Sequence, residues 1–254
     1  MSKLATAERV STELSDNFVF QRSLLAYHEA AKRISGRVLE IGTGSGYGVK
    51  IIAPHATRFT TLDKHLPAAD LLKETTVEFK EATVPPLPFE DESFDFVISF
   101  QVIEHIKDDK LFVEEIRRVL RPEGSFIVST PNIKMSLTRN PWHVREYTKE
   151  EFSSLLGIGF SKIEALGVGG DAMIMEYYNK NREGVKRITR FDLLNLQYRL
   201  PRWMLQVPYD ILNRLNRKKL LDENNSLTAS IQMDNYHIEP ASDNSFDLFY
   251  IAQK

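Results

Sequence analysis

The stretch RVLEIGTGSGYG, residues 37–48, decides the fold. It begins as a short, mostly apolar run and then places a glycine at every second position from Gly42 to Gly48. A helix-like segment follows, which Pro54 closes. A strand that enters a glycine-rich turn and then a helix predicts a nucleotide site, because glycine lets a ligand approach the backbone and the helix N-terminus offers free N–H groups.

The glycine spacing separates two classes of nucleotide. The dinucleotide pattern G-x-G-x-x-G fails, because its sixth position is Tyr47 when read from Gly42 and Val49 when read from Gly44. Residues 40–46 read E-x-G-x-G-x-G instead. Asp63 ends the next strand and can bind two ribose hydroxyls, as the corresponding acid does in NAD sites. Asp63 therefore supports a nucleoside ligand without choosing its class.

The rest of the chain continues the alternation of strands and helices. Helix patterns occupy 67–76, 108–120 and 149–156, the last opened by a capping box at Thr148 and Glu151. Strand patterns occupy 37–42, 58–63, 77–82, 94–100, 124–130, 161–167 and 246–254. The sequence therefore predicts an α/β fold, a doubly wound, mostly parallel, Rossmann-like sheet of seven strands with a helical insertion before the last strand.

Composition narrows the classes of protein. The 254 residues carry a net charge of −2 and include no cysteine, which excludes disulfide scaffolds, thiolate metal sites and cysteine nucleophiles. The first ten residues lack the layout of a signal peptide, and no apolar run approaches the roughly 20 residues that span a bilayer. We therefore expect a cytoplasmic location.

The segment 171–240 differs chemically from its surroundings. Residues 180–219 hold eleven basic and three acidic side chains, with apolar residues at near-helical spacing. Two interpretations stay open: a lid packed on the core or on a partner subunit, or a surface that contacts an anionic membrane or receives a lipid-linked substrate. The expected organisation is an N-terminal helical cap at 1–36, a core at 37–170 and 241–254, and the insertion at 171–240.

Four ordered segments resemble a known family. Besides 40–46 and Asp63, these are LPFEDESFDFVISFQVIEH at 87–105 and RRVLRPEGSFIVSTPN at 117–132. Together they resemble the class I S-adenosylmethionine (SAM)-dependent methyltransferases of type 11, and segments 20–36 and 140–152 are similar to members associated with glycan, lipid or quinone biosynthesis. The resemblance implies SAM as cofactor and S-adenosylhomocysteine as its product.

Carried over position by position, the resemblance implies a set of cofactor-binding residues. These are Arg22, Glu40, Gly42, Thr43, Gly44, Gly46, Asp63, Lys64, Glu81, Ala82, Phe100 and Gln101. Glu40 would organise the loop, Asp63 would bind the ribose, and Arg22 would pair with the SAM carboxylate. Glu81 and Ala82 stand where relatives carry an Asp-Ala pair that meets the adenine.

The sequence says less about the residues that face the methyl acceptor than about those that bind the cofactor. His143 and Tyr147 are expected by resemblance to face the acceptor, and His105 is either a base or a structural histidine. The six histidines show no paired ligand spacing, so no metal is expected. The predicted function is methyl transfer to a hydroxyl or amine of a small molecule, such as a sugar, lipid-linked glycan or quinone-like precursor.

Two other functions are compatible with the sequence. These are an NAD-dependent Rossmann enzyme and a non-catalytic binding or scaffold protein. A nucleic-acid partner is not expected, because the core is acidic and shows no recognisable RNA-binding module. The sequence is also compatible with an oligomer.

Overall fold

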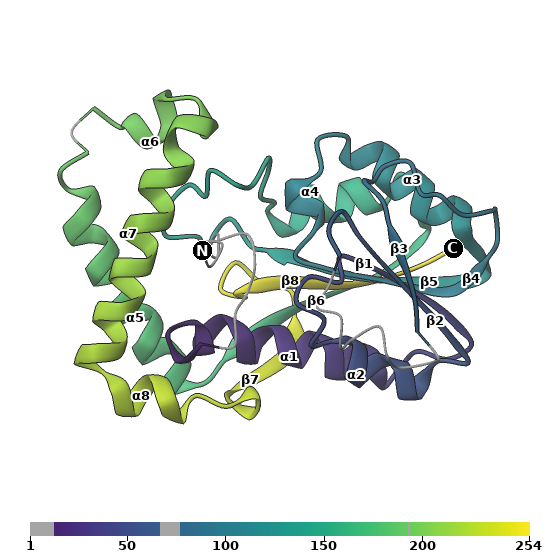
Figure 1. The fold of residues 1–254 in the computed structure, drawn as a ribbon, viewed down its shortest axis with the longest axis horizontal. Helices are drawn as coiled ribbons and strands as arrows, with labels where there is room; N and C mark the ends of the chain where they lie inside the picture. Colours follow the sequence, from purple (N-terminus) through teal and green to yellow (C-terminus); the bar gives the residue numbers. More distant parts are fainter. Residues whose placement is uncertain (1–12, 67–76, 193) are drawn as a thin grey trace.

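The computed structural model describes residues 13–66, 77–192 and 194–254 (Figure 1). Its centre is one eight-stranded sheet in the order β3-β2-β1-β4-β5-β8-β6-β7. The strands are β1 (Arg37–Ile41), β2 (Arg58–Asp63), β3 (Val77–Glu81), β4 (Phe94–Phe100), β5 (Leu120–Pro131), β6 (Lys162–Gly170), β7 (Tyr236–Pro240) and β8 (Asp247–Gln253). The first five run parallel, β8 runs antiparallel between β5 and β6, and β7 pairs antiparallel with β6.

The predicted Rossmann-like, mostly parallel sheet is confirmed, but the prediction of seven strands is wrong. The eighth strand, β7, lies inside the segment assigned to the insertion, so the sheet extends into that segment. β7 is five residues long, carries polar His237 and Glu239, and ends at Pro240. An edge strand tolerates proline and polar side chains, and such a short run carries little strand signal in the sequence. The helix predicted at 67–76 lies outside the described residues.

Helices cover both faces of the sheet. α1 (Asn17–Ala31) and the short α2 (Val49–Ile52) pack on one face, whereas α3 (Asp109–Val119) and α4 (Lys149–Leu156) pack on the other (Figure 1). Two clusters of buried apolar side chains fill the spaces between the sheet and these layers. The predicted capping box is present, since Thr148 Oγ1 accepts from Glu151 N and a Glu151 carboxylate oxygen accepts from Thr148 N. The core therefore has three layers.

Strand register brings the predicted cofactor residues to one edge. Ile41 of β1 pairs with Leu62 of β2 and Ser99 of β4. The residues that follow these three positions therefore leave the sheet together at its carboxyl edge, where α/β sheets bind ligands. Gly42 N donates to Leu62 O at 2.7 Å, which continues the ladder into the glycine turn.

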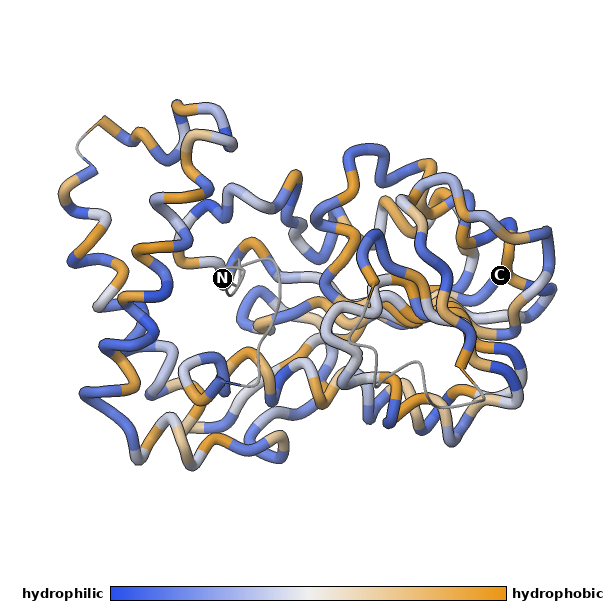
Figure 2. Tube along the Cα trace, in the orientation of Figure 1, coloured by the Kyte–Doolittle hydropathy of each residue, from blue (hydrophilic) through white to orange (hydrophobic). Residues whose placement is uncertain are grey.

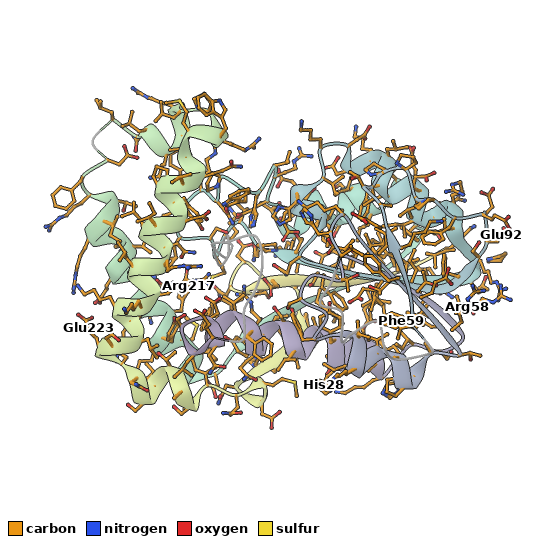
Figure 3. All side chains as sticks on the ribbon, in the orientation of Figure 1. His28, Arg58, Phe59, Glu92, Arg217 and Glu223 are labelled. Atoms are coloured by element: carbon orange, nitrogen blue, oxygen red, sulfur yellow. The ribbon has the colours of Figure 1, made fainter. Side chains whose placement is uncertain are left out.

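The insertion forms a helical layer beyond the end of the sheet (Figure 1). It contains α5 (Ala172–Thr189), α6 (Leu196–Arg199), α7 (Arg202–Glu223) and α8 (Asn225–Ser230). α1 fastens it to the core, because the buried Asn17 Nδ2 donates to Thr228 O at 2.8 Å and to Ile231 O at 2.9 Å. Arg217 extends from the inner side of α7 and pairs with Asp16, whereas Glu223 lies on the outer side (Figure 3).

One row of apolar side chains along α7 is exposed to solvent. Trp203, Val207, Ile211 and Leu215 recur every four residues and are 72%, 67%, 52% and 59% exposed. Figure 2 shows apolar stretches along α7 alternating with polar ones. Contact of the basic segment 180–219 with a membrane stays a prediction. Within the described parts of the chain, no helix is long and apolar enough to cross a membrane.

The Asn17 clamp predicts a measurable loss of stability. Asn17→Ala leaves two buried carbonyl oxygens without their donor, so the free energy of unfolding should fall by about 2 kcal/mol. Urea denaturation measures this change. Asn225→Ala, at an exposed asparagine of α8, is the matched control and should change it by less than about 0.5 kcal/mol. Equal effects of the two substitutions would contradict the clamp.

Candidate active site

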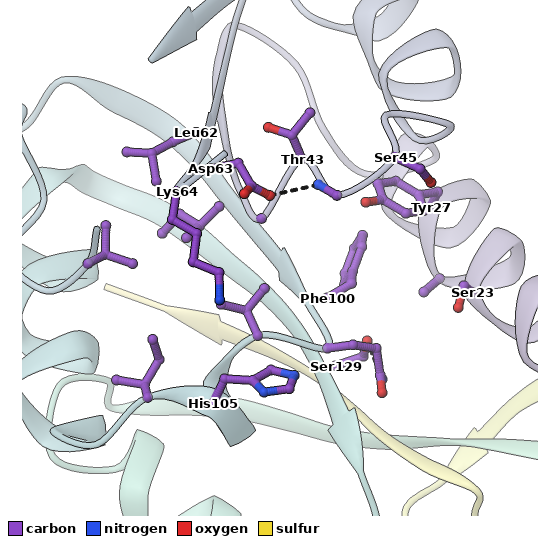
Figure 4. Close-up of a pocket in the computed structure, with 18 of the residues that line it drawn as sticks. Ser23, Tyr27, Thr43, Ser45, Leu62, Asp63, Lys64, Phe100, His105 and Ser129 are labelled. Carbon is purple, nitrogen blue, oxygen red and sulfur yellow. Dashed lines mark hydrogen bonds between the residues drawn. The ribbon is translucent and has the colours of Figure 1, made fainter. Parts of the chain in front are cut away.

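A pocket of about 310 Å³ lies at the carboxyl edge of the parallel strands (Figure 4). β1 and its glycine turn, the ends of β2 and β4, and one side of α1 form its walls. Asp63, Phe100 and His105 point into it from β2, from β4 and from the 3-10 turn Ile103–His105 (Figure 4). The pocket therefore lies where the sequence predicts the nucleotide site.

The glycine turn has backbone angles that strongly favour glycine. Gly42, Gly44 and Gly46 have φ angles of 96°, 56° and 81°, a region that L side chains rarely adopt. A Cβ at Gly42 would lie 2.4 Å from Val102 Cγ2. Gly44 N donates to Asp63 Oδ2 at 2.9 Å, so the turn and the acid at the end of β2 fix each other.

Glu40 lies beneath this turn. Its side chain is buried and accepts a hydrogen bond from Tyr27 OH at 2.7 Å and one from Thr61 Oγ1 at 2.5 Å. Thr43 Oγ1 lies 2.6 Å from Thr61 Oγ1 and donates to it, since the hydroxyl proton of Thr61 is directed at Glu40. Burial raises the pKa of Glu40 to about 7, although both hydrogen bonds oppose the shift. The predicted organising role fits this position.

The structure gathers most of the predicted cofactor residues around the pocket. Its lining includes Arg22, Gly42, Thr43, Gly44, Asp63, Lys64, Ala82, Phe100 and Gln101. Gly46 supports the turn, and Glu81 ends β3 with an exposed side chain; neither is among the residues that line the pocket. Ala82, which follows Glu81, reaches it.

Sequence reasoning missed several polar lining residues, among them Tyr27 and Asp247. Asp247 begins β8, and its Oδ2 lies 2.8 Å from Arg22 Nε; both side chains are largely buried. Burial raises the pKa of Asp247, and the positive charge of Arg22 opposes that shift. The guanidinium predicted to meet the SAM carboxylate thus already has a protein carboxylate beside it. An acid inside the otherwise apolar closing strand was the available signal.

His105 has a defined tautomer. Its Nδ1 lies 3.0 Å from the carbonyl oxygen of Trp142. A carbonyl only accepts, so Nδ1 carries a proton, and in the neutral ring the lone pair is then on Nε2. Figure 4 shows the ring at the floor of the pocket. A histidine held in this way can take a proton from a bound hydroxyl.

A polar chamber of about 240 Å³ adjoins the pocket and shares Arg22, Gln101 and His105 with it. His143 lines this chamber, with its ring edge-on to His105 at 5.0 Å and its Nδ1 2.6 Å from Glu146 Oε1. Burial lowers the pKa of His143, but the Glu146 hydrogen bond and the nearby carboxylates together raise it above its ordinary value. His143 therefore lines the chamber next to His105, and its role toward an acceptor stays a prediction.

Three residues at this junction could hold a divalent cation. The ligand atoms of Glu104, His105 and His143 all lie within 4.8 Å of one another. Nitrogen and carboxylate donors suit zinc and related ions. Spacing along the chain gave no indication of this group, because the fold brings His143 across from a loop 38 residues away.

Tyr147 corrects an expectation. Its side chain is fully buried, and its hydroxyl donates to Asp109 Oδ2 at 2.9 Å. It packs against Phe152 in the layer of α3 and α4, and it lines neither the pocket nor the chamber. The residue therefore anchors its loop to the core and does not face the acceptor.

Comparison with known proteins identifies the family. A model of the methyltransferase domain matches residues 39–128. A probable S-adenosylmethionine-dependent methyltransferase of Mycolicibacterium smegmatis is 34% identical over 261 residues, covering 97% of this chain and 93% of that protein. The chain belongs to the SAM-dependent methyltransferases. The predictions of the family and its cofactor are confirmed, and the NAD-dependent alternative is wrong.

Other matches to this methyltransferase agree. A probable SAM-dependent methyltransferase of Mycobacterium tuberculosis is 39% identical over 173 residues, which are 64% of this chain and 63% of that protein. A Thermotoga maritima structure, described as a SAM-dependent methyltransferase and possible histamine N-methyltransferase, superposes with a TM-score of 0.58 at 16% identity, covering 93% of this chain and 92% of that chain. This last likeness shows the fold alone.

The pKa of Glu40 predicts a pH dependence of stability. The folded methyltransferase holds this proton up to about pH 7, whereas the unfolded chain releases it near 4.5. The free energy of unfolding should therefore fall as pH rises through this window, by at most about 3 kcal/mol from this group. Glu104, whose pKa burial also raises to about 7, adds a fall of the same sign.

Glu40→Gln isolates the contribution of Glu40. Urea denaturation of ligand-free protein at pH 5 and pH 7.5 should show a smaller fall for Glu40→Gln than for the unmodified chain. Glu114→Gln, at an exposed position of α3, is the control and should retain the full fall. The same slope in all three proteins would show that Glu40 is ionised in the fold.

Proposed function

We propose that this methyltransferase moves the methyl group of SAM to a hydroxyl or amine of a small molecule, such as a sugar, lipid-linked glycan or quinone-like precursor. The observation that carries the proposal is the junction of the two cavities: the cofactor pocket and the polar chamber meet at Gln101 and His105. A donor in one cavity and an acceptor in the other would have their reacting atoms at this junction.

The pocket residues suit the cofactor in the order that the resemblance implies. The Asp63 carboxylate at the end of β2 would accept from the ribose hydroxyls, and the glycine turn would pass beneath the ribose and methionine. Ala82 would contact the adenine, and Lys64 lies beside Asp63 at the pocket wall. Gln101, itself at a positive φ of 56°, would line the sulfonium end with Phe100.

The cofactor supplies a methyl group already activated by its sulfonium charge, so the protein has to align the acceptor and exclude water. For a hydroxyl acceptor it must also remove a proton. His105 Nε2 is the candidate base, because His105 lines both cavities and the Trp142 carbonyl holds the proton on Nδ1. The proton would pass to Nε2 as the acceptor oxygen attacks the methyl carbon and the sulfur departs with the bonding electrons.

The chamber walls favour a polar reacting group. Besides the two histidines, Glu104, Asn132 and Asn140 line it with oxygen and nitrogen atoms. Asn132 Nδ2 donates to Ser245 O at 2.8 Å, and Asn140 Oδ1 accepts from Trp142 N at 3.0 Å. These bonds fix the walls and support binding of a hydroxyl or amine rather than an apolar end.

The ribose assignment predicts the effect of Asp63→Ala on cofactor affinity. The substitution removes a charged acceptor for two hydroxyls and the Gly44 contact, so the Kd for S-adenosylhomocysteine should rise at least about 100-fold. Calorimetric titration measures it, with Asp243→Ala as the control at an exposed aspartate. Unchanged affinity in Asp63→Ala would remove Asp63 from the site.

The base assignment predicts a separate effect on turnover. His105→Asn keeps an N–H for the Trp142 carbonyl but removes the basic ring nitrogen, so kcat should fall by about 10²- to 10⁴-fold. The assay follows transfer of labelled methyl from SAM to a panel of sugars, quinone precursors and amines. S-adenosylhomocysteine should still bind, and His55→Asn, at an exposed histidine, should leave turnover unchanged.

Two results would count against this proposal. Full activity of His105→Asn toward a hydroxyl acceptor would exclude His105 as the base. S-adenosylhomocysteine binding without methyl transfer to any panel member or to cell extract would favour the non-catalytic alternative.

A further inference from the structure

A third cavity, of about 670 Å³, lies within the helical insertion. α5, α6 and α7 form its walls, and the loop around Arg139 closes it on the side of the core. Six apolar residues that carry the argument are Val185, Ile188, Leu200, Leu205, Pro208 and Leu212. We propose that this cavity binds an apolar chain of the methyl acceptor, an alkyl or isoprenoid tail, while the polar end of the same molecule occupies the chamber beside His105. The inference rests on the proposed function and specifies its substrate class.

The three cavities form one path. The polar chamber shares Arg22, Gln101 and His105 with the cofactor pocket, and it shares Thr138, Val185, Tyr209 and Asn213 with the apolar cavity. A molecule with its polar end in the chamber would pass these shared side chains to extend between α5 and α7 into the apolar cavity. The order along the path is cofactor, polar chamber and apolar cavity.

The charged residues of the apolar cavity are held by the protein itself. Arg139 Nη1 donates to Gln197 O at 2.9 Å. The carboxylate of Asp192 accepts from Leu196 N at 2.6 Å and from Gln197 N at 3.1 Å. Both groups therefore stabilise the turn before α6. Most of the remaining wall is hydrocarbon, which offers a ligand contact area rather than hydrogen bonds.

An apolar chain suits these walls better than a second sugar unit. A sugar hydroxyl moved from water to a hydrocarbon wall loses hydrogen bonds that the wall does not replace. A methylene group gains about 0.8 kcal/mol on the same transfer. The lining also includes Phe191 and Leu194, which are 74% and 63% exposed, so the cavity is open to solvent rather than enclosed.

A chain-length series tests the proposal directly. The probes are n-alkyl β-glucosides with six, eight and ten carbons, used below their micelle concentrations and titrated by calorimetry in the presence of S-adenosylhomocysteine. In the unmodified protein, Kd should fall about fourfold for each added methylene, the equivalent of about 0.8 kcal/mol. A Kd that is independent of chain length overturns the proposal.

Substitutions within the insertion locate the effect. Leu205→Trp on α7 and Ile188→Trp on α5 each fill the cavity and should weaken decyl glucoside binding at least tenfold. Val207→Trp, two residues along α7 at a position that is 67% exposed, is the matched control and should bind as the unmodified protein does. Two filling variants guard against one that fails to fold, and circular dichroism checks each. Equal binding by all the variants overturns the proposal.

Two further readouts separate this proposal from its alternatives. S-adenosylhomocysteine should bind equally to the unmodified protein and all three variants. If it binds none of them, the proposed function fails, whatever the glucosides do. Sedimentation velocity tests whether a second copy of the chain covers the cavity instead. A concentration-dependent dimer that Leu205→Trp and Ile188→Trp dissociate overturns the chain-binding site.

Discussion

The buried carboxylate of Glu40 is the contact on which the cofactor side of the molecule depends. It receives hydrogen bonds from α1 through Tyr27 and from β2 through Thr61, so one side chain joins β1 to a helix and to a neighbouring strand. A Cβ at Gly48 would lie 2.0 Å from Tyr27 Cε1, so the Tyr27 ring occupies the space that a side chain there would need. Helix, strand and glycine turn therefore fit together only with an acid at one position and glycine at another.

The sequence was sufficient to predict the part of the site that is formed by the ends of successive strands. Glycine spacing, the acid at residue 63 and the apolar strand 94–100 are local patterns, and a parallel sheet brings the ends of successive strands to one edge. Family membership and fold class follow from these patterns. The edge strand β7 escaped prediction because an alternation of apolar and polar residues that ends after five positions at Pro240 is too short to stand out from a loop.

Contacts made across the fold were beyond reach of the sequence. Asp247 meets Arg22 from the other end of the chain, and the group of Glu104, His105 and His143 forms only when the loop after β5 folds back over β4. Tyr147 shows the opposite case. The resemblance placed it near the acceptor, but a tyrosine whose hydroxyl reaches Asp109 is satisfied inside the core and turns away from the site.

α1 contacts both the helical insertion and the cofactor pocket of the methyltransferase. Its first turn carries Asn17, which anchors α8, and its later turns carry Arg22 and Tyr27 at the cofactor pocket. Fifteen helical residues form a nearly rigid rod of about 22 Å. A tilt that suits a ligand at one end must therefore move the other end as well. A ligand that tilted the rod at one end would therefore change the affinity at the other end, and by thermodynamic reciprocity the factor would be the same in both directions.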